Sequence, residues 1–331
     1  MSTRLVVVGA GGVAQRHVEV LSAIPDVDVV GIIDPLEDAA RSLAQRCGAT
    51  AYSSTGEALD ECRPDGAYVC VPPFAHGEPE REVLERGLPL FVEKPLSVRP
   101  EVAEDLARRV AEAGVVTGTG YHWRCLDTVQ AASERLEASP AVLATGYWLD
   151  KRPPVAWWPH RDRSGGQVVE QLTHVLDVAR VLLGEAVEVY AAGALRAPDP
   201  AESDGGPPRG DVDDATAATI RFASGTVATL AATSLLRTKH RAALHTFSDG
   251  LVLELTEASL TVDDGERRDV VEPTEDPREV VDREFVAAVR GERESTRAPY
   301  EEALRTHRLA CALAESARRR EPVRLREEGQ S

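Results

Sequence analysis

Two small groups of polar residues in this chain have the types and spacing that acid–base chemistry requires. Lys94 lies in a Glu93-Lys94-Pro95 turn directly after an apolar run. Glu170 and His174 are four residues apart in a strongly apolar segment, so a helix would place both on one face. Oxidation of an alcohol carbon needs a base for the hydroxyl proton and a positive charge for the developing oxyanion. We expect His174 to be the base, Glu170 to orient the substrate or raise the basicity of His174, and Lys94 to supply the charge.

Simpler interpretations of these residues stay open at this point. Lys94 could be a surface lysine in a turn fixed by Pro95, which could contain a cis bond. His174 could be a histidine whose polar atoms are satisfied inside a hydrophobic core. A Glu-x-x-x-His pair can also bind a metal, but no third ligand is apparent in the sequence, so we expect no metal.

The elements that would position this chemistry start with a glycine-rich turn. An apolar run leads into Gly9, Gly11 and Ala14, which fit the pattern G-x-G-x-x-G/A of dinucleotide-binding turns. The next apolar run ends in Asp34, where a carboxylate would bind the ribose hydroxyls of NAD and repel the additional phosphate of NADP. We therefore expect NAD rather than NADP as the cofactor. The expected cofactor-binding residues are Gly9, Gly11, Gly12, Val13, Ala14, Asp34, Pro72, Pro73, His76, Glu93 and Lys94.

Over the first third of the chain, apolar runs of strand length alternate with helical patterns. One of the expected helices covers residues 75–86. That alternation predicts a parallel, doubly wound sheet whose strand carboxyl ends border one crevice. Beyond it come a helical pattern at 167–183 and several strand-like runs joined by short turns, which predict an open, mainly antiparallel sheet. We expect an α/β fold with a Rossmann domain over 1–120 and an α+β substrate-binding domain over 121–331. The last helix, at about 299–319, is expected to pack back toward the first domain.

The charge, the lengths of the apolar segments and the cysteine spacing limit which classes of partner the chain can have. The chain has 331 residues and a net charge of −17, which argues against a nucleic-acid partner or an anionic membrane surface. No apolar segment is long enough to span a membrane. The five cysteines are scattered without a C-x-x-C pair, as is typical of reduced thiols, so we expect a cytoplasmic protein.

Aromatic and basic residues gather in two further segments, residues 120–124 and residues 151–163. Indole rings can cover the apolar faces of sugar rings, and cations can hold a carboxylate or phosphate. An ordinary surface loop in an arginine-rich protein is the alternative for the second of these segments, residues 151–163. The expected substrate-binding residues are Tyr121, His122, Arg124, Lys151, Trp157, Trp158, His160, Glu170 and His174.

These motifs together resemble those of the Gfo/Idh/MocA family, which includes glucose–fructose oxidoreductase and inositol dehydrogenase. The resemblance covers nearly the whole chain, and Glu170 stands where the family usually has an aspartate. It implies a Rossmann domain followed by a domain whose open sheet forms a wall of the substrate pocket and the interface of a homodimer or homotetramer. The motifs that carry it are Gly9-x-Gly11-x-x-Ala14, Pro72-Pro73-x-x-His76, Glu93-Lys94-Pro95 and GGQVVEQLTHVLD at residues 165–177.

We therefore expect an NAD-dependent oxidoreductase that moves a hydride between nicotinamide and a hydroxyl or ketone carbon of a sugar, sugar derivative or cyclitol. Two alternatives belong to other classes. A non-enzymatic dinucleotide-binding sensor or regulator would need neither Lys94 nor His174, and both are present. A redox-neutral lyase or glycosidase-type enzyme would retain its NAD and turn over without net formation of NADH.

Overall fold

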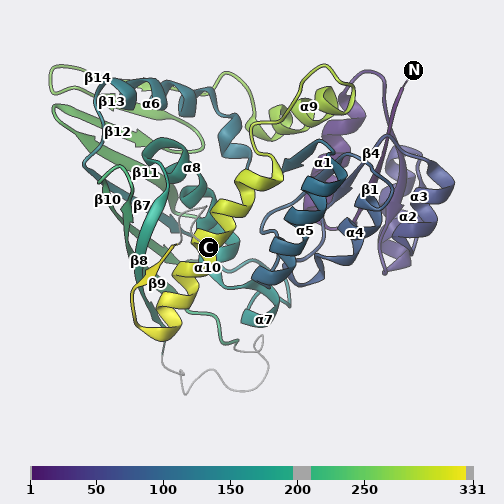
Figure 1. Ribbon diagram of the computed structural model, residues 1–331, viewed down its shortest axis with the longest axis horizontal. Helices are drawn as coiled ribbons and strands as arrows, with labels where there is room; N and C mark the ends of the chain where they lie inside the picture. The colour runs from purple at the N-terminus through teal and green to yellow at the C-terminus, as the bar shows by residue number, and fades with distance from the viewer. Residues whose placement is uncertain (1, 197–209, 326–331) are drawn as a thin grey trace. The chain divides into compact units, whose positions relative to one another are not determined.

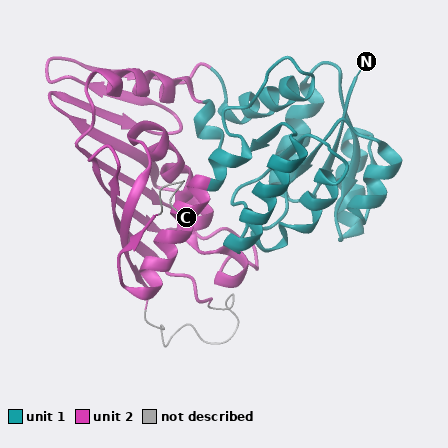
Figure 2. Ribbon diagram, in the orientation of Figure 1, with its two compact units in different colours: residues 1–125, 275–304 teal, residues 126–274, 305–331 magenta. Residues whose placement is uncertain are grey.

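A computed structural model describes residues 2–196 and 210–325 of the chain. The described residues form two compact units, shown in different colours in Figure 2. Unit 1 contains the chain up to Cys125 together with Glu275–Leu304, and unit 2 contains Leu126–Thr274 and the chain from Arg305 onward. The first boundary thus lies five residues beyond the expected one, and a segment distant in sequence completes unit 1.

Unit 1 is built on a six-stranded sheet in which all strands are parallel. Its order, β3-β2-β1-β4-β5-β6, is that of a dinucleotide-binding Rossmann sheet. The expected parallel, doubly wound sheet is therefore confirmed, and strand ends that carry candidate residues share one edge. The strands are β1 (Thr3–Val8), β2 (Val27–Ile33), β3 (Thr50–Tyr52), β4 (Gly66–Val69), β5 (Leu90–Val92) and β6 (Thr117–Thr119).

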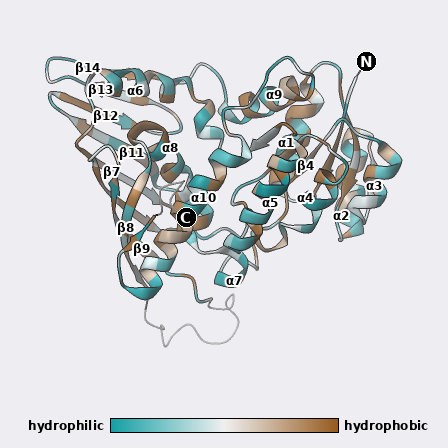
Figure 3. Ribbon diagram, in the orientation of Figure 1, coloured by the Kyte–Doolittle hydropathy of each residue, from teal (hydrophilic) through white to brown (hydrophobic). Residues whose placement is uncertain are grey.

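Helices cover both faces of this sheet (Figure 1), because its central strands are apolar on both sides (Figure 3). One face packs against α1, α2 and α9, and the other against α3, α4 and α5. The helix expected at 75–86 is shorter, because Gly77, with φ +130°, interrupts it after a 3₁₀ turn at Pro73–Ala75. The helices are α1 (Gly12–Ala23), α2 (Glu37–Cys47), α3 (Thr55–Cys62), α4 (Glu78–Leu84), α5 (Pro100–Ala113) and α9 (Pro277–Val289).

Unit 2 is built on a nine-stranded sheet in the order β14-β13-β12-β11-β7-β10-β9-β8-β15. Neighbouring strands are antiparallel except β7 and β10, which pair in parallel, so the expected open and mainly antiparallel sheet is confirmed. The strands are β7 (Leu143–Leu149), β8 (Ala186–Ala194), β9 (Ala215–Phe222), β10 (Val227–Thr233), β11 (Arg241–Ser248), β12 (Leu251–Leu255), β13 (Leu260–Asp263), β14 (Arg268–Val271) and β15 (Val323–Arg324).

The helices of unit 2 are α6 (Asp127–Ala138), α7 (Arg161–Ser164), α8 (Thr173–Leu183) and α10 (Tyr300–Arg319), whose first residues belong to unit 1. Helix α8 is buried along most of its length and is tied to α10 by the Thr306 hydroxyl. That hydroxyl donates to Asp177 Oδ1 at 2.6 Å and accepts from Arg180 at 2.8 Å. Among the described residues, no helix offers an apolar stretch of the length that a bilayer requires.

Candidate active site

The turn between β1 and α1 needs glycine at one position and leaves open space at two others. Gly9 has φ +104°, and a Cβ on it would lie 2.3 Å from the carbonyl oxygen of Cys70. A Cβ on Gly11 or Gly12 would meet no atom within 4 Å. Because the first backbone N–H groups of a helix have no partner inside it, bare backbone beside open space at the start of α1 fits a pyrophosphate.

Asp34 joins this turn to the end of β2. Its Oδ2 accepts from the Ala10 N–H at 2.9 Å, and its Oδ1 accepts from the Leu36 N–H at 2.8 Å. The carboxylate therefore fixes the glycine turn through the Ala10 N–H. Its remaining lone pairs can accept hydrogen bonds from ribose hydroxyls.

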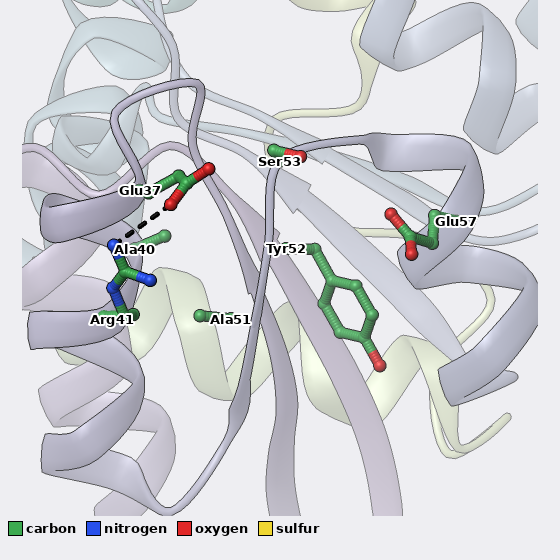
Figure 4. A pocket seen from close by; sticks show the side chains of 7 residues that line it. All are labelled: Glu37, Ala40, Arg41, Ala51, Tyr52, Ser53 and Glu57. Atoms are coloured by element: carbon green, nitrogen blue, oxygen red, sulfur yellow. Dashed lines mark hydrogen bonds and ion pairs between the residues drawn. The ribbon is translucent and has the colours of Figure 1, made fainter.

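A cavity of about 270 Å³ lies beside this strand end (Figure 4). One of its lining residues is Tyr52, whose carbonyl accepts from the Asp34 N–H at 3.1 Å. Another is Arg41, whose guanidinium donates to Glu37 at 3.0 Å and to Asp38 at 3.2 Å. Its positive charge is thus already matched by carboxylates, which weakens it as a clamp for a phosphate.

His76 is buried at the start of the helical segment after β4. Its Nδ1 lies 2.5 Å from Glu80 Oε1, and the other oxygen of Glu80 accepts from the Gly77 N–H at 2.7 Å. Both side chains are fully buried, so this pair fixes the turn that carries Pro72 and Pro73.

Glu93 and Lys94 follow β5. Glu93 is buried, its Oε1 lies 2.9 Å from His17 Nε2 and 3.3 Å from Arg16, and its Oε2 accepts from the Lys94 N–H at 3.0 Å. Burial alone would raise the pKa of Glu93, but the hydrogen bond and charge of His17, helped by Arg16 and Lys94, lower it to about 2. Lys94 is half-buried, and the Lys94–Pro95 bond is cis, as the turn sequence suggested.

The segment after β6 is largely internal to unit 1. Tyr121 is fully buried in an apolar cluster, and His122 Nδ1 lies 3.4 Å from the Gly120 carbonyl oxygen. The Arg124 guanidinium lies 3.4 Å from both the Arg297 carbonyl oxygen and Glu302. These contacts show what holds the segment, and its role toward a substrate stays a prediction.

The helical segment with Glu170 and His174 is not one uniform α-helix. A π-helical stretch, Val168–Leu172, precedes α8, so Glu170 lies in the π turn and His174 in the first turn of α8. The uniform helix expected at 167–183 is therefore wrong in its first part. Gly165 and Gly166, at φ +76° and +90°, lead into the wider turn, and such turns are frequent at functional sites.

Two tryptophans pack against this pair. Trp158 is fully buried, and its Nε1 donates to Glu170 Oε2 at 3.0 Å. The Trp148 ring is stacked on the His174 ring with 5.6 Å between centroids and 26° between planes. The ammonium of Lys239 lies 4.6 Å from the Trp148 ring centroid. The indole of Trp158 thus holds Glu170, and its expected contact with substrate stays a prediction.

In the loop that starts at Lys151, two of the arginines are paired with acids of the same unit. Arg161 lies 3.1 Å from Asp213, and Arg152 lies 3.6 Å from Asp214. These pairs reduce the positive charge that the loop could offer to an anionic substrate. Of the other candidate residues in the loop, Lys151 is exposed, and Trp157 and His160 are half-buried.

Sequence reasoning missed the charged residues that surround Glu93. His17 lies on the buried face of α1 with Ala14, Val18 and Leu21, and its Nδ1 is 2.7 Å from Asp282 of α9. A titratable residue at an apolar helix position was the signal that could have identified it. Its partner could not be identified in this way, because the two residues are 265 positions apart.

Comparison with known proteins identifies both parts of the chain. Residues 3–121 match the oxidoreductase family described as having an NAD-binding Rossmann fold, and residues 141–255 match the GFO/IDH/MocA C-terminal domain. The scyllo-inositol 2-dehydrogenase (NAD(+)) of Bacillus subtilis (strain 168) is 28% identical over 187 residues, 55% of this chain and 54% of the relative. The 2,7-anhydro-N-acetylneuraminate hydratase of Escherichia coli (strain K12) is 25% identical over 232 residues, 68% of this chain and 60% of the relative.

Among solved structures, levoglucosan dehydrogenase in complex with NADH has the same fold. It superposes with a TM-score of 0.87 at 20% identity and covers 99% of this chain and 100% of that one. The matched segments span only about half to three-fifths of the two curated relatives, 54% and 60%. Two family domains in the expected order, with their motif residues at the strand ends and in the π turn, show that the chain belongs to the Gfo/Idh/MocA family of oxidoreductases, with an NAD-binding Rossmann domain.

Proposed function

We propose that this protein is an NAD-dependent dehydrogenase or reductase that acts on a CH–OH carbon of a sugar, sugar derivative or cyclitol. The observation that carries the proposal lies in unit 1. Lys94 follows a parallel strand at the same sheet edge as the glycine turn and Asp34, and Glu93 holds its backbone. Ligands of open parallel sheets bind outside this edge, so a cation at this place can act beside a bound dinucleotide.

Unit 1 would hold the cofactor through bare backbone and one carboxylate. Gly11 and Gly12 border the space for the pyrophosphate, and Asp34 accepts from the ribose. When bound, NAD supplies the hydride acceptor. Lys94 then supplies positive charge to the oxygen of the carbon that is oxidised.

Unit 2 would supply the base. His174, with 5% of its surface exposed, takes the hydroxyl proton, and Glu170 orients the substrate and favours the charged form of the imidazole. The half-buried Trp157 and His160 and the exposed Lys151 can contact the substrate ring and its hydroxyls. A neutral substrate fits this loop better than a polyanion, because Arg152 and Arg161 are already paired with acids.

A screen of substrate classes tests the proposal. Cyclitols, aldoses and uronic acids are incubated with the protein and NAD, and formation of NADH is followed by absorbance. The corresponding ketones are tested with NADH for the reverse direction, and Lys94→Ala protein serves as the blank for contaminating dehydrogenases. We expect turnover of at least one neutral polyol class. Saturating binding of NADH, observed by fluorescence, with no turnover in any class would contradict the proposal.

A second candidate function is a redox-neutral reaction in which NAD is retained. The hydratase among the relatives favours it, because a hydration is not a net oxidation. Cofactor that remains with the protein after purification, together with substrate consumption and no accumulation of NADH, would identify this mode. Release of NADH in proportion to oxidised product would identify the dehydrogenase.

We also propose that the protein is a homo-oligomer, a dimer or tetramer, formed through the nine-stranded sheet. One face of the sheet carries small or apolar exposed residues in register, with Leu143 beside Val227 and Ala217 beside Ala231. Such an exposed face of small and apolar residues fits a second copy of itself. Light scattering would show a dimer or tetramer, and Ala231→Arg is expected to shift it toward monomer. We propose the cytoplasm as its location, since none of the five cysteines forms a disulfide in the described residues.

A further inference from the structure

A buried charged network stands directly behind Lys94. The His17 ring has both nitrogens within hydrogen-bonding distance of carboxylates: Nδ1 is 2.7 Å from Asp282 Oδ1, and Nε2 is 2.9 Å from Glu93 Oε1. A neutral imidazole has one N–H and one lone pair, so it could not donate to both acids. When both acids are ionised, the imidazole between them must therefore carry a positive charge.

The surroundings keep these charges fixed. Burial opposes the charge on His17, but the charges and hydrogen bonds of Asp282 and Glu93 outweigh it and raise its pKa to about 9. Arg16 adds a second positive charge 3.3 Å from Glu93, so two cations balance two carboxylates. Tyr68 and Cys70 also face the network, and burial raises the pKa of both well above the usual values, so they stay neutral.

Glu93 has little room to move away from this network. Its Oε2 accepts from the Lys94 N–H at 3.0 Å, and a Cβ on Gly120 would lie 2.3 Å from that same oxygen. The carboxylate is thus enclosed by His17, the backbone of Lys94 and the bare backbone of Gly120. A shift of Glu93 would be transmitted to Lys94, because the two share a hydrogen bond as well as a peptide bond.

We propose that His17 and Asp282 are positioning residues for Lys94: they hold Glu93 in place, and Glu93 holds the backbone from which the Lys94 side chain extends. His17 belongs to α1, the helix whose first turn borders the pyrophosphate space, so the network also ties the nucleotide-binding helix to Lys94. This inference rests on the proposed role of Lys94 in the reaction, and its test separates the two.

The test uses Asp282→Asn, which keeps the shape of the side chain but removes one charge of the network. Displacement of a catalytic group by a fraction of an ångström to about 1 Å lowers turnover by about 10- to 100-fold. We expect kcat to fall in this range and NADH affinity, measured by fluorescence, to change by a much smaller factor. Asp105→Asn is the matched control, because Asp105 is a half-buried acid of the same unit that is paired with Arg81 and Arg109. It should leave kcat unchanged.

A second readout follows Lys94 without turnover. The chain has only three lysines, Lys94, Lys151 and Lys239, so reductive methylation with labelled formaldehyde gives few NMR signals, and the signal missing from Lys94→Ala identifies Lys94. Asp282→Asn should shift the Lys94 signal and leave the other two in place. This readout stands even if no sugar or cyclitol is turned over, so failure of the proposed function is distinguishable from failure of the positioning role.

Gly120→Ala provides a test that alters no charge. Its Cβ would displace the Glu93 carboxylate, so kcat should fall and the Lys94 signal should shift as in Asp282→Asn. A purely structural role of the network predicts a lower melting temperature, normal kcat in the folded fraction and an unmoved Lys94 signal. That result in both variants would overturn the proposal.

Discussion

Lys94 and His174 are held by opposite physical means. In unit 1, His17, Asp282 and Arg16 fix Glu93, and Glu93 fixes the backbone of Lys94. In unit 2, Trp148 stacks on His174, and Trp158 donates to Glu170. A balanced set of charges thus holds the backbone of Lys94, whereas an aromatic ring packs on His174.

The difference fits what each residue is proposed to do. A base changes its protonation state in every turnover, and a ring that does not titrate can support both of its states. Lys94 keeps its charge, so its support can be ionic. The pKa of Glu93 is lowered to about 2 and that of His17 is raised to about 9, so both stay charged over the range between these values. Variants of the two sites can break or sharpen this comparison.

The largest effect is expected for His174→Ala. Loss of a positioned base lowers turnover by roughly 10²- to 10⁴-fold. In the wild type, oxidation should rise with pH as the imidazole becomes neutral, and the variant should lose this acidic limb. His245→Ala, a half-buried histidine of the same unit that contacts Tyr147, is the matched control. An enzyme without His174 that keeps the full acidic limb would overturn the assignment of the base.

Lys94→Ala should be the next largest. Removal of one donor to an oxyanion lowers turnover by about two orders of magnitude or more. NADH binding should change little, because the glycine turn and Asp34 remain intact. Near-normal turnover in this variant, measured as kcat at saturating substrate, would show that Lys94 has only a structural role. The comparison of its support with that of His174 would then have no bearing on catalysis.

Local sequence patterns predicted the scaffold on which these residues sit. The turn from Gly9 to Ala14 and the strand end at Lys94 were predictable, because an apolar run followed by glycine or proline has few local solutions. The same patterns misplaced the helix start near residue 167, where a π turn replaces an α turn. An extra residue in a helical turn shifts the apolar spacing by one position, but this segment is apolar at most of its positions, so periodicity does not reveal the shift.

The supports of the site were not predictable, since they depend on residues distant in sequence. The approach of Asp282 to His17 depends on α9 returning to unit 1, and pairing across 265 residues has no local pattern. The neutralisation of Arg152 by Asp214 depends likewise on the approach of two loops. Residue types and their spacing in the sequence identified the candidate chemical groups. Ion pairs that form only in the folded chain determined which of the candidate charges are matched by a partner.

Glu170→Gln sharpens the description of unit 2. The amide keeps an oxygen for the Trp158 indole N–H but loses the carboxylate charge in the turn before His174. Turnover should fall less than in His174→Ala, and the acidic limb should move to lower pH, because a carboxylate near an imidazole favours its charged form. pH–rate profiles and melting temperatures on the same preparation measure both. An unmoved limb with a lower melting temperature would leave Glu170 a purely structural role.

Cofactor choice tests the charges of unit 1 at a second place. NAD should be preferred over NADP by at least about tenfold in kcat/KM, which needs only ~1.4 kcal/mol of discrimination. Asp34→Asn keeps an oxygen for the Ala10 N–H and removes the charge that repels a phosphate, so the preference should shrink. A wild-type preference for NADP would contradict this account of Asp34.

The smallest effect is expected at the aromatic support of His174. An aromatic pair contributes about 0.5–1.5 kcal/mol, so Trp148→Leu should lower kcat by roughly tenfold at most, whereas Trp148→Phe keeps a ring and should lower it less. Lys239→Gln removes the cation over Trp148 and should have a smaller effect still, because its side chain is 44% exposed and also pairs with Glu257. Arg241→Gln, which removes a similarly exposed cation from the Glu254 pair, is its matched control. Because Trp148→Phe keeps an uncharged ring on His174, the acidic limb should keep its position in this variant. A limb displaced as far as in Glu170→Gln would show that Trp148 tunes the charge of His174, and the contrast between the two units would then fail.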